Sequence, residues 1–201
     1  MNTNIASALT ISCTYKGYRE MVSGLIKKRF STGNKQSDDM LHYSELNETR
    51  MNRLEKTIKI TAEVHDKLVQ IKNRYTWLVI SEGWCGDAAQ ILPVVYKMAE
   101  LSDYIDLKIV LRDENENLMN NFLTHGAKSI PKLIVLDEGY NVLGDFGPRP
   151  FSAQKLLVDY KAINGLVDEP IKVELQKWYL HDKGVSTQNE IMQLMKTKEV
   201  V

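Results

Sequence analysis

The sequence predicts an α/β protein, built from a mixed β-sheet with helices on both faces. Apolar runs at residues 77–80 and 133–136, and the largely apolar segment 105–111, are typical of core strands in such a sheet. Between these runs, apolar residues recur at the spacing of helices that pack against the sheet. A chain of 201 residues provides one domain with attachments, or two small domains, and needs no disulfide to hold its core.

Residues 1–55 predict an N-terminal helical extension. Apolar positions with helical spacing occur on both sides of residues 31–39, a polar stretch that predicts a loop. The extension has too few apolar residues to form a core alone. We therefore expect it to pack on the rest of the chain.

Residues 56–163 predict the main domain, which opens with a strand and a helix. Residues 57–60 alternate between polar and apolar positions, as in a short strand. Thr61 is placed to cap the helix that follows. The buried strand at 77–80 then leads into a long helix that begins near Gly86.

The second half of this domain contains the remaining strands. After the second buried strand, Asp113 and Glu116 predict a capping box for a helix that ends near Gly126. The strand at 133–136 is followed by a turn, a further strand at 142–146 and a closing helix. The predicted order of elements is β-α-β-α-β-α-β-β-α.

Helices end the chain. Residues 151–163 predict the closing helix of the main domain, and residues 164–201 predict a C-terminal helical extension. The three predicted parts are therefore an extension at 1–55, a main domain at 56–163 and an extension at 164–201.

The charge of the chain argues against nucleic acid or an anionic membrane as its main partner. The 26 Lys and Arg residues balance the 26 Asp and Glu residues, so the formal net charge is zero. No stretch approaches the roughly 18 apolar residues that span a bilayer. The short apolar run before Cys13 also lacks the basic residue that opens a lipoprotein signal. We expect a cytoplasmic protein with no nucleic-acid and no membrane partner.

The cysteine and histidine content predicts neither a disulfide scaffold nor a metal site. Cys13 and Cys85 are the two cysteines, and the four histidines are scattered without paired spacing. We therefore expect no metal, no cofactor and a reducing compartment for the protein.

A short motif, Trp-Cys-Gly-Asp-Ala at residues 84–88, stands where a buried strand meets a helix. It resembles the Trp-Cys-Gly-Pro-Cys active-site segment of thioredoxins. Pro93 falls where that family has the proline that kinks the active-site helix. Pro131 precedes a buried strand, as the family's cis-proline does. The resemblance covers residues 56–163 and implies a thioredoxin fold with extra N- and C-terminal helices.

More narrowly, the chain is similar to a thioredoxin-family group found in bacteria, which has extra N-terminal helices and a single-cysteine Trp-Cys-Gly-Asp-Ala site. The stretches that carry this likeness are residues 77–93, 111–115, 129–134 and 147–150. This resemblance implies the fold and a reactive-site cysteine without naming a substrate.

Three departures from the thioredoxin pattern bear on the chemistry. Ala88 replaces the second, resolving cysteine, so the motif cannot close the usual disulfide. Val79 stands where thioredoxins carry a buried carboxylate that helps to deprotonate the resolving thiol. Asp87 replaces the proline that tunes the redox potential. A dithiol reductase cycle is therefore not expected.

The position of Cys85 predicts a reactive, modestly acidic thiol. Unsatisfied N–H groups and the positive end of the helix macrodipole favour the thiolate at a helix start. The Asp87 carboxylate opposes the thiolate by an amount of similar size. We expect the Cys85 sulfur to be exposed at the helix start and to face Pro131. The alternative is a buried, inert cysteine.

Other residues are candidates for supporting this site. The residues that flank the thiol in the motif are Trp84, Gly86, Asp87 and Ala88. The resemblance implies a cis bond before Pro131 and a backbone at Ile130 that pairs with an extended substrate; the alternative is an ordinary proline at a strand start. Glu82, Arg112 and Arg149 are candidate charged neighbours that otherwise belong to the solvated surface. Cys13 is a candidate resolving thiol, although nothing in the sequence places it near Cys85.

Three functions fit these residues, and they leave open whether the protein is an enzyme. In monothiol exchange, the Cys85 thiolate attacks a protein disulfide or an adduct of a small thiol such as glutathione, and an external reductant thiol releases the mixed disulfide. In the second function, the same groove serves a non-enzymatic binding or adaptor module. In the third, oxidised Cys85 couples two chains as a redox sensor.

Overall fold

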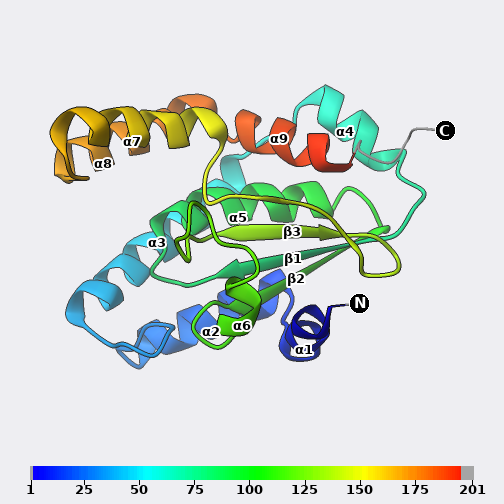
Figure 1. The fold of residues 1–201 in the computed structure, drawn as a ribbon, viewed down its shortest axis with the longest axis horizontal. Helices are drawn as coiled ribbons and strands as arrows, with labels where there is room; N and C mark the ends of the chain where they lie inside the picture. Colours follow the sequence, from blue (N-terminus) through cyan, green and yellow to red (C-terminus); the bar gives the residue numbers. More distant parts are fainter. Residues whose placement is uncertain (1, 196–201) are drawn as a thin grey trace.

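The computed structural model describes residues 2–195, which form a mixed four-stranded sheet with helices on both faces (Figure 1). The strand order is β2-β1-β3-β4, with β1 parallel to β2 and with β3 antiparallel to both β1 and β4. The predicted α/β class is confirmed. The strands are β1 (Tyr75–Ser81), β2 (Ile105–Leu111), β3 (Lys132–Leu136) and β4 (Val142–Phe146).

The helices are α1 (Thr3–Ile11), α2 (Tyr15–Lys27), α3 (Asp38–Thr57), α4 (Ala62–Val69), α5 (Gly86–Ala99), α6 (Glu116–Met119), α7 (Phe151–Asn164), α8 (Glu169–Asp182) and α9 (Val185–Met195). Helices α5 and α9 lie on one face of the sheet, and α1, α2 and α6 lie on the other (Figure 1). Helix α3 packs along α5, while α7 and α8 pack on each other near the end of the sheet where α5 begins. Among the described residues, no helix is long and apolar enough to cross a membrane.

The core forms from largely apolar segments that other elements cover on both sides. Residues 77–80 of β1 and the whole of β3 are buried, as expected for strands that are covered on both faces. Helix α5 is buried along most of its length because the sheet lies on one side of it and α3 on the other. Pro93 lies inside this helix, as the likeness to thioredoxins implies.

The N-terminal helices pack on the sheet. Tyr18 and Val22 of α2 are buried in the main hydrophobic core. Between α1 and α2, Cys13 exchanges two backbone hydrogen bonds with Ile109 of β2, with N···O distances of 2.9 and 2.8 Å. The extension is therefore joined to the edge of the sheet. At the other end, residues 196–201 of the predicted C-terminal extension lie outside the described residues.

The strand predicted at residues 57–60 is wrong. Helix α3 continues through Thr57, and the segment that follows is not paired with any strand. Two of its backbone groups bond instead to Gln188 of α9, whose amide donates to the Lys59 carbonyl at 3.1 Å and accepts the Thr61 N–H at 2.9 Å. A side chain more than a hundred residues away in sequence thus replaces the neighbouring strand. The predicted cap is confirmed, because the Thr61 hydroxyl accepts the Val64 N–H at 3.3 Å.

The capping box predicted after β2 is also wrong. Helix α6 spans only Glu116–Met119, and no side chain caps its start. The Asp113 carboxylate instead binds Arg112 at 2.9 Å and accepts the Asn34 N–H at 3.3 Å. Gly126, with φ of +78°, lies in a turn beyond the helix. Contacts with the N-terminal loop therefore override the local helix signal.

Candidate functional site

Cys85 is the N-cap residue of α5, in the turn that follows β1. Its Sγ accepts the N–H of Ala88 at 3.5 Å and donates to the carbonyl oxygen of Ile130 at 3.3 Å. The peptide bond between Ile130 and Pro131 is cis. The thiol therefore lies between the start of α5 and the loop that precedes β3.

The prediction of an exposed, modestly acidic thiol is wrong. Cys85 is buried, with only 7% of its surface exposed. Burial raises the pKa of the Cys85 thiol to about 12, and the Asp87 carboxylate adds to this rise. The N–H groups of Ala88 and Asp87 lower the pKa, as does Arg149, but by less than burial raises it. Loss of hydration therefore outweighs the helix terminus, and Cys85 is buried rather than exposed.

Asp87 is held by partners from two distant segments. Its Oδ2 forms an ion pair with Nη2 of Arg149 at 2.5 Å, and its Oδ1 accepts a hydrogen bond from the Tyr179 hydroxyl at 2.9 Å. Burial raises the pKa of Asp87, while Arg149 and Tyr179 oppose that rise. Among the charged residues considered as neighbours of the motif, Arg149 is the one that contacts Asp87.

A close backbone approach places Arg149. Gly147 has φ of +115°, and a Cβ at this position would lie 2.2 Å from the carbonyl oxygen of Pro131. Only glycine fits such a conformation without strain. The loop before α7 can therefore pack directly on the Pro131 loop. From this position before α7, Arg149 extends to Asp87 and Gln154.

The other residues of the motif occupy different surroundings. Ala88 is buried, whereas Trp84 and Gly86 are partly exposed. The guanidinium of Arg112 lies over the Trp84 ring, 4.9 Å from its centroid, in a cation–π contact. Arg112 therefore contacts the motif through Trp84.

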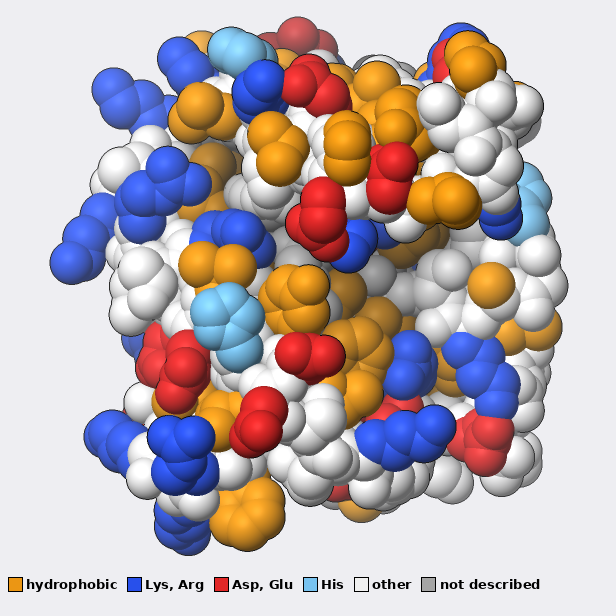
Figure 2. Space-filling model, turned by 90° about the vertical axis from the view of Figure 1, so that its left-hand side faces the viewer, with side chains coloured by type: hydrophobic (Ala, Val, Ile, Leu, Met, Phe, Trp, Pro, Cys, Tyr) orange, Lys and Arg blue, Asp and Glu red, His pale blue; other side chains and the backbone are white. Residues whose placement is uncertain are grey.

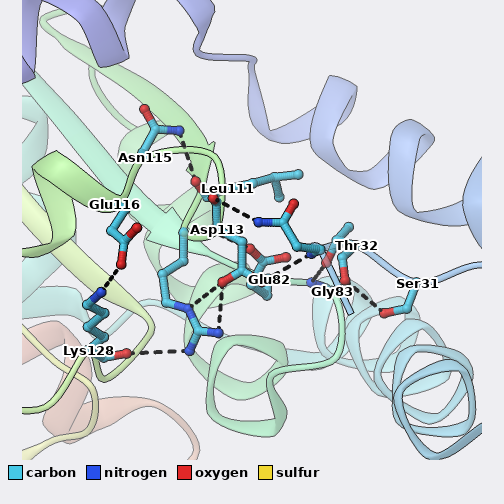
Figure 3. A network of polar contacts seen from close by, with 12 residues as sticks. Ser31, Thr32, Glu82, Gly83, Leu111, Asp113, Asn115, Glu116 and Lys128 are labelled. Carbon is cyan, nitrogen blue, oxygen red and sulfur yellow. Dashed lines mark hydrogen bonds and ion pairs between the residues drawn. The ribbon is translucent and has the colours of Figure 1, made fainter. Parts of the chain in front are cut away.

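Glu82 joins the motif to the N-terminal extension. Figure 3 shows Glu82 and Gly83 between the loop that carries Thr32 and the turn that carries Asp113. The Glu82 Oε1 accepts the Asp113 N–H at 3.0 Å, and the Thr32 hydroxyl accepts the Gly83 N–H at 2.8 Å. Burial raises the pKa of Glu82, because its side chain is fully enclosed in this network.

Cys13 lies at a different place in the sheet. It is a free cysteine at the outer edge of β2, where its backbone pairs with Ile109 and its Sγ donates to the Ile109 carbonyl at 3.5 Å. Within the described residues, no group of three or more His, Cys, Asp or Glu side chains is arranged to hold a metal ion.

A cavity of about 740 Å³ opens beside the motif, between α3 and the α7–α8 pair. Figure 2 shows this face of the molecule, where hydrophobic side chains gather in the hollow and charged groups surround it. The polar and motif residues that line the cavity include Arg50, Trp84, Gly86, Asp87, Arg149 and Gln154. Asp87 therefore contributes to the cavity wall, whereas Cys85 is buried and is not part of that wall.

Two residues that contribute to this site were not predicted from the sequence. Arg50 lies on α3 and Tyr179 on α8, and each is one polar residue among several on a helix of mixed character. No local motif marks either of them. Only the folding of α3 and α8 around the start of α5 brings them to Asp87.

Solved structures resemble this chain at low sequence identity. An HIV epitope-scaffold, 4E10, matches 92% of this chain and 98% of its own, with 18% identity and a TM-score of 0.57. A protein of unknown function from Pseudomonas aeruginosa matches 75% of this chain and 88% of its own, with 22% identity and a TM-score of 0.47. The NTD_N/C domain of the alkylhydroperoxide reductase AhpF from Enterococcus faecalis matches 50% of this chain and 49% of its own, with 16% identity and a TM-score of 0.38. Only the first is close enough to support the fold, and none bears on function.

Sequence families give the clearer result. Comparison with curated proteins finds no match. A thioredoxin family model matches residues 33–162, which is well over half of the chain. The mixed sheet, the Cys85 turn at the start of α5 and the Pro131 loop opposite it agree with that match. The chain therefore belongs to the thioredoxin family and is a thioredoxin-like protein with added helices at both ends.

Proposed function

We propose that this thioredoxin-like protein is a binding module, in which a ligand enters the cavity beside Asp87 and Cys85 serves as a buried structural thiol. One observation carries the proposal. The Cys85 sulfur is covered and hydrogen-bonded to Ile130, whereas Asp87, two residues further on, forms part of the cavity wall.

The chemistry of the thiol supports binding over catalysis. Thiol exchange needs a thiolate that reaches a substrate sulfur. With its pKa raised to about 12, the Cys85 thiol is almost entirely protonated at neutral pH. Ala88 supplies no resolving thiol, and Val79 supplies no buried proton acceptor. The same burial speaks against a sensor that couples two chains through Cys85.

The reactivity of Cys85 tests this proposal. The Cys13→Ser variant leaves Cys85 as the one thiol, and Cys85→Ser is the matched control that reports Cys13. Because a thiol reacts through its thiolate, we expect iodoacetamide to alkylate native Cys85 at pH 7.5 at least about 100-fold more slowly than the unfolded chain. Alkylation at the rate of the unfolded chain would overturn the structural role.

Ligand capture tests the binding role directly. A binding module keeps its partners when the sulfur is removed, so Cys85→Ala and the wild-type chain are expected to retain the same partners in affinity purification. Partners that depend on the sulfur, and that reducing agent releases, would argue for exchange instead.

Monothiol exchange is the second candidate, because the sulfur accepts an N–H at the helix start and contacts the Ile130 carbonyl beside the cis-proline. In this scheme Cys85 loses its proton, attacks one sulfur of a protein disulfide or glutathione adduct, and expels the other as a thiolate. An external thiol then attacks the mixed disulfide and restores Cys85. Equal activity of wild type and Cys85→Ser in a deglutathionylation assay would end this candidate.

Further assignments remain proposals that follow from the sequence. They are membership of the bacterial single-cysteine group, a cytoplasmic location, the absence of nucleic-acid and membrane partners, and domain boundaries at residues 55/56 and 163/164. The site-supporting roles of Trp84, Gly86, Asp87 and Ala88 belong with them, as do the substrate-binding roles of Ile130 and Pro131.

A further inference from the structure

We propose that the cavity between α3 and the α7–α8 pair binds a small amphipathic anion, a molecule with an apolar body and one acidic group. This inference rests on the proposed binding function and names its ligand class. The acidic group would lie near Arg50 and Arg149, and the apolar body would lie along α7 and α8.

The size and walls of the cavity suit a small molecule. Its volume of about 740 Å³ falls within the roughly 300–1,000 Å³ typical of ligand pockets. Apolar side chains from three helices and the α7–α8 loop line it, as Figure 2 shows for this face. These residues are Leu46, Leu157, Val158, Val167, Val173 and Leu175.

The charges near Asp87 are unequal. Around Asp87, two guanidinium groups, those of Arg50 and Arg149, accompany one carboxylate. Elsewhere on the cavity wall, Glu169 pairs with Lys172, and Lys161 adds a further positive charge. Arg50 is half-buried and donates to the amide oxygen of Asn47 at 2.8 Å, a neutral partner. Among the described residues, the buried Nε of Arg149 has no hydrogen-bond partner. The lining groups therefore carry a net positive charge, with one guanidinium in excess beside Asp87, and an anion inside the cavity would balance it.

These two features together select the ligand. A small inorganic anion would leave the apolar walls in contact with water, and an uncharged apolar molecule would leave the surplus guanidinium without a counter-ion. A molecule that carries both an apolar body and an acid satisfies both parts of the wall.

A matched pair of fluorescent probes tests the inference. The first probe is 8-anilinonaphthalene-1-sulfonate, and the second is N-phenyl-1-naphthylamine, which has the same aromatic body without the sulfonate. We expect saturable, one-to-one binding of the sulfonate to the folded chain. The uncharged probe is expected to bind at least about 10-fold more weakly, because it forms no charge-assisted hydrogen bond.

Variants locate the site and separate charge from shape. Arg50→Gln is expected to weaken the sulfonate about 10-fold and to leave the uncharged probe unchanged. Lys177→Gln, which removes one positive charge from the exposed outer face of α8, is the matched control and is expected to change neither. Val158→Trp, at a half-exposed position on the cavity wall, is expected to weaken both probes by filling the space.

Three outcomes would overturn the inference: no saturable binding of the sulfonate, equal binding of both probes, or equal effects of Arg50→Gln and Lys177→Gln. Thermal unfolding of each variant shows that the fold is retained. These failures differ from failure of the binding function, which would appear as rapid alkylation of Cys85 and loss of partners in Cys85→Ala.

Discussion

Two buried carboxylates flank the Trp84–Cys85 turn, and their surroundings differ. Asp87 faces the cavity and is balanced first by a cation, Arg149, and then by the Tyr179 hydroxyl. Glu82 faces the N-terminal extension, and the groups that most lower its pKa are neutral donors, the Thr32 hydroxyl and the Asp113 N–H. Burial raises the pKa of both carboxylates, so the two sites differ in the groups that act to lower the pKa again.

The comparison teaches how one turn joins two parts of the molecule. On the Asp87 side, an ion pair places charged groups at a cavity wall. On the Glu82 side, neutral hydrogen bonds close a fully buried contact between the extension and the sheet. The first side therefore borders a cavity, and the second joins the N-terminal extension to the sheet.

The largest expected effect comes from removing the cation on the Asp87 side. Arg149→Gln leaves a buried carboxylate without its ion pair, which costs about 3–5 kcal/mol of unfolding free energy in comparable cases. Because Arg149 is partly exposed, we expect a loss of unfolding free energy at the lower end of this range, about 3 kcal/mol. Urea unfolding measures the change.

A double variant shows whether the charge is responsible. In Asp87→Asn with Arg149→Gln, the buried charge is gone, so most of the lost stability is expected to return. If the double variant is no more stable than Arg149→Gln alone, then the difference between the two sides is not electrostatic.

Substitutions at two glycines, one on each side of the turn, test how tightly each side is packed. A Cβ at Gly147 would meet the backbone oxygen of Pro131 at 2.2 Å, whereas a Cβ at Gly33 would meet the side chain of Asp113 at 2.7 Å. A side chain can move aside and a backbone cannot, so we expect Gly147→Ala to destabilise by about 3 kcal/mol and Gly33→Ala by about 1–2 kcal/mol. The opposite ranking in thermal unfolding would contradict this account of the two loops.

The smallest effect concerns Glu82 and depends on pH. The folded state holds the Glu82 proton more tightly than the unfolded state, because burial raises the Glu82 pKa. The stability that the folded protein gains from protonated Glu82 is therefore complete below the unfolded pKa of about 4.3. It is lost as the pH rises through the raised folded pKa. Glu82→Gln removes that loss, and we expect the variant to be more stable than wild type by on the order of 1 kcal/mol at pH 7, with no difference at pH 4. A difference that does not change with pH would show that Glu82 acts by packing alone.

The parts of the fold that the sequence predicts well are those with strong local signals. Residues 77–80 and 133–136 are continuous apolar runs, and enclosure on both faces of a sheet is the arrangement that satisfies them. Residues 57–60 carry only a weak alternation, and the side chain of Gln188 from another helix decides their backbone pairing.

The site follows the same rule. The helix-start position of Cys85 is visible in the local motif, and the structure has it there. Its burial is not visible, because it depends on the Ile130 carbonyl and on helices that arrive from both ends of the chain. Arg50 and Tyr179 are missed for the same reason: their role arises from the packing of α3 and α8 rather than from their neighbours in sequence.

The backbone pairing of Cys13 with Ile109 affects how the molecule meets its own copies. β2 is the outermost strand on its side of the sheet, and an open outermost strand invites chain-to-chain growth. The link between α1 and α2 crosses this strand and occupies both main-chain groups of Ile109. The segment between the first two helices thus covers the open strand at Ile109, and we expect a chain trimmed of these helices to aggregate more readily than the full chain.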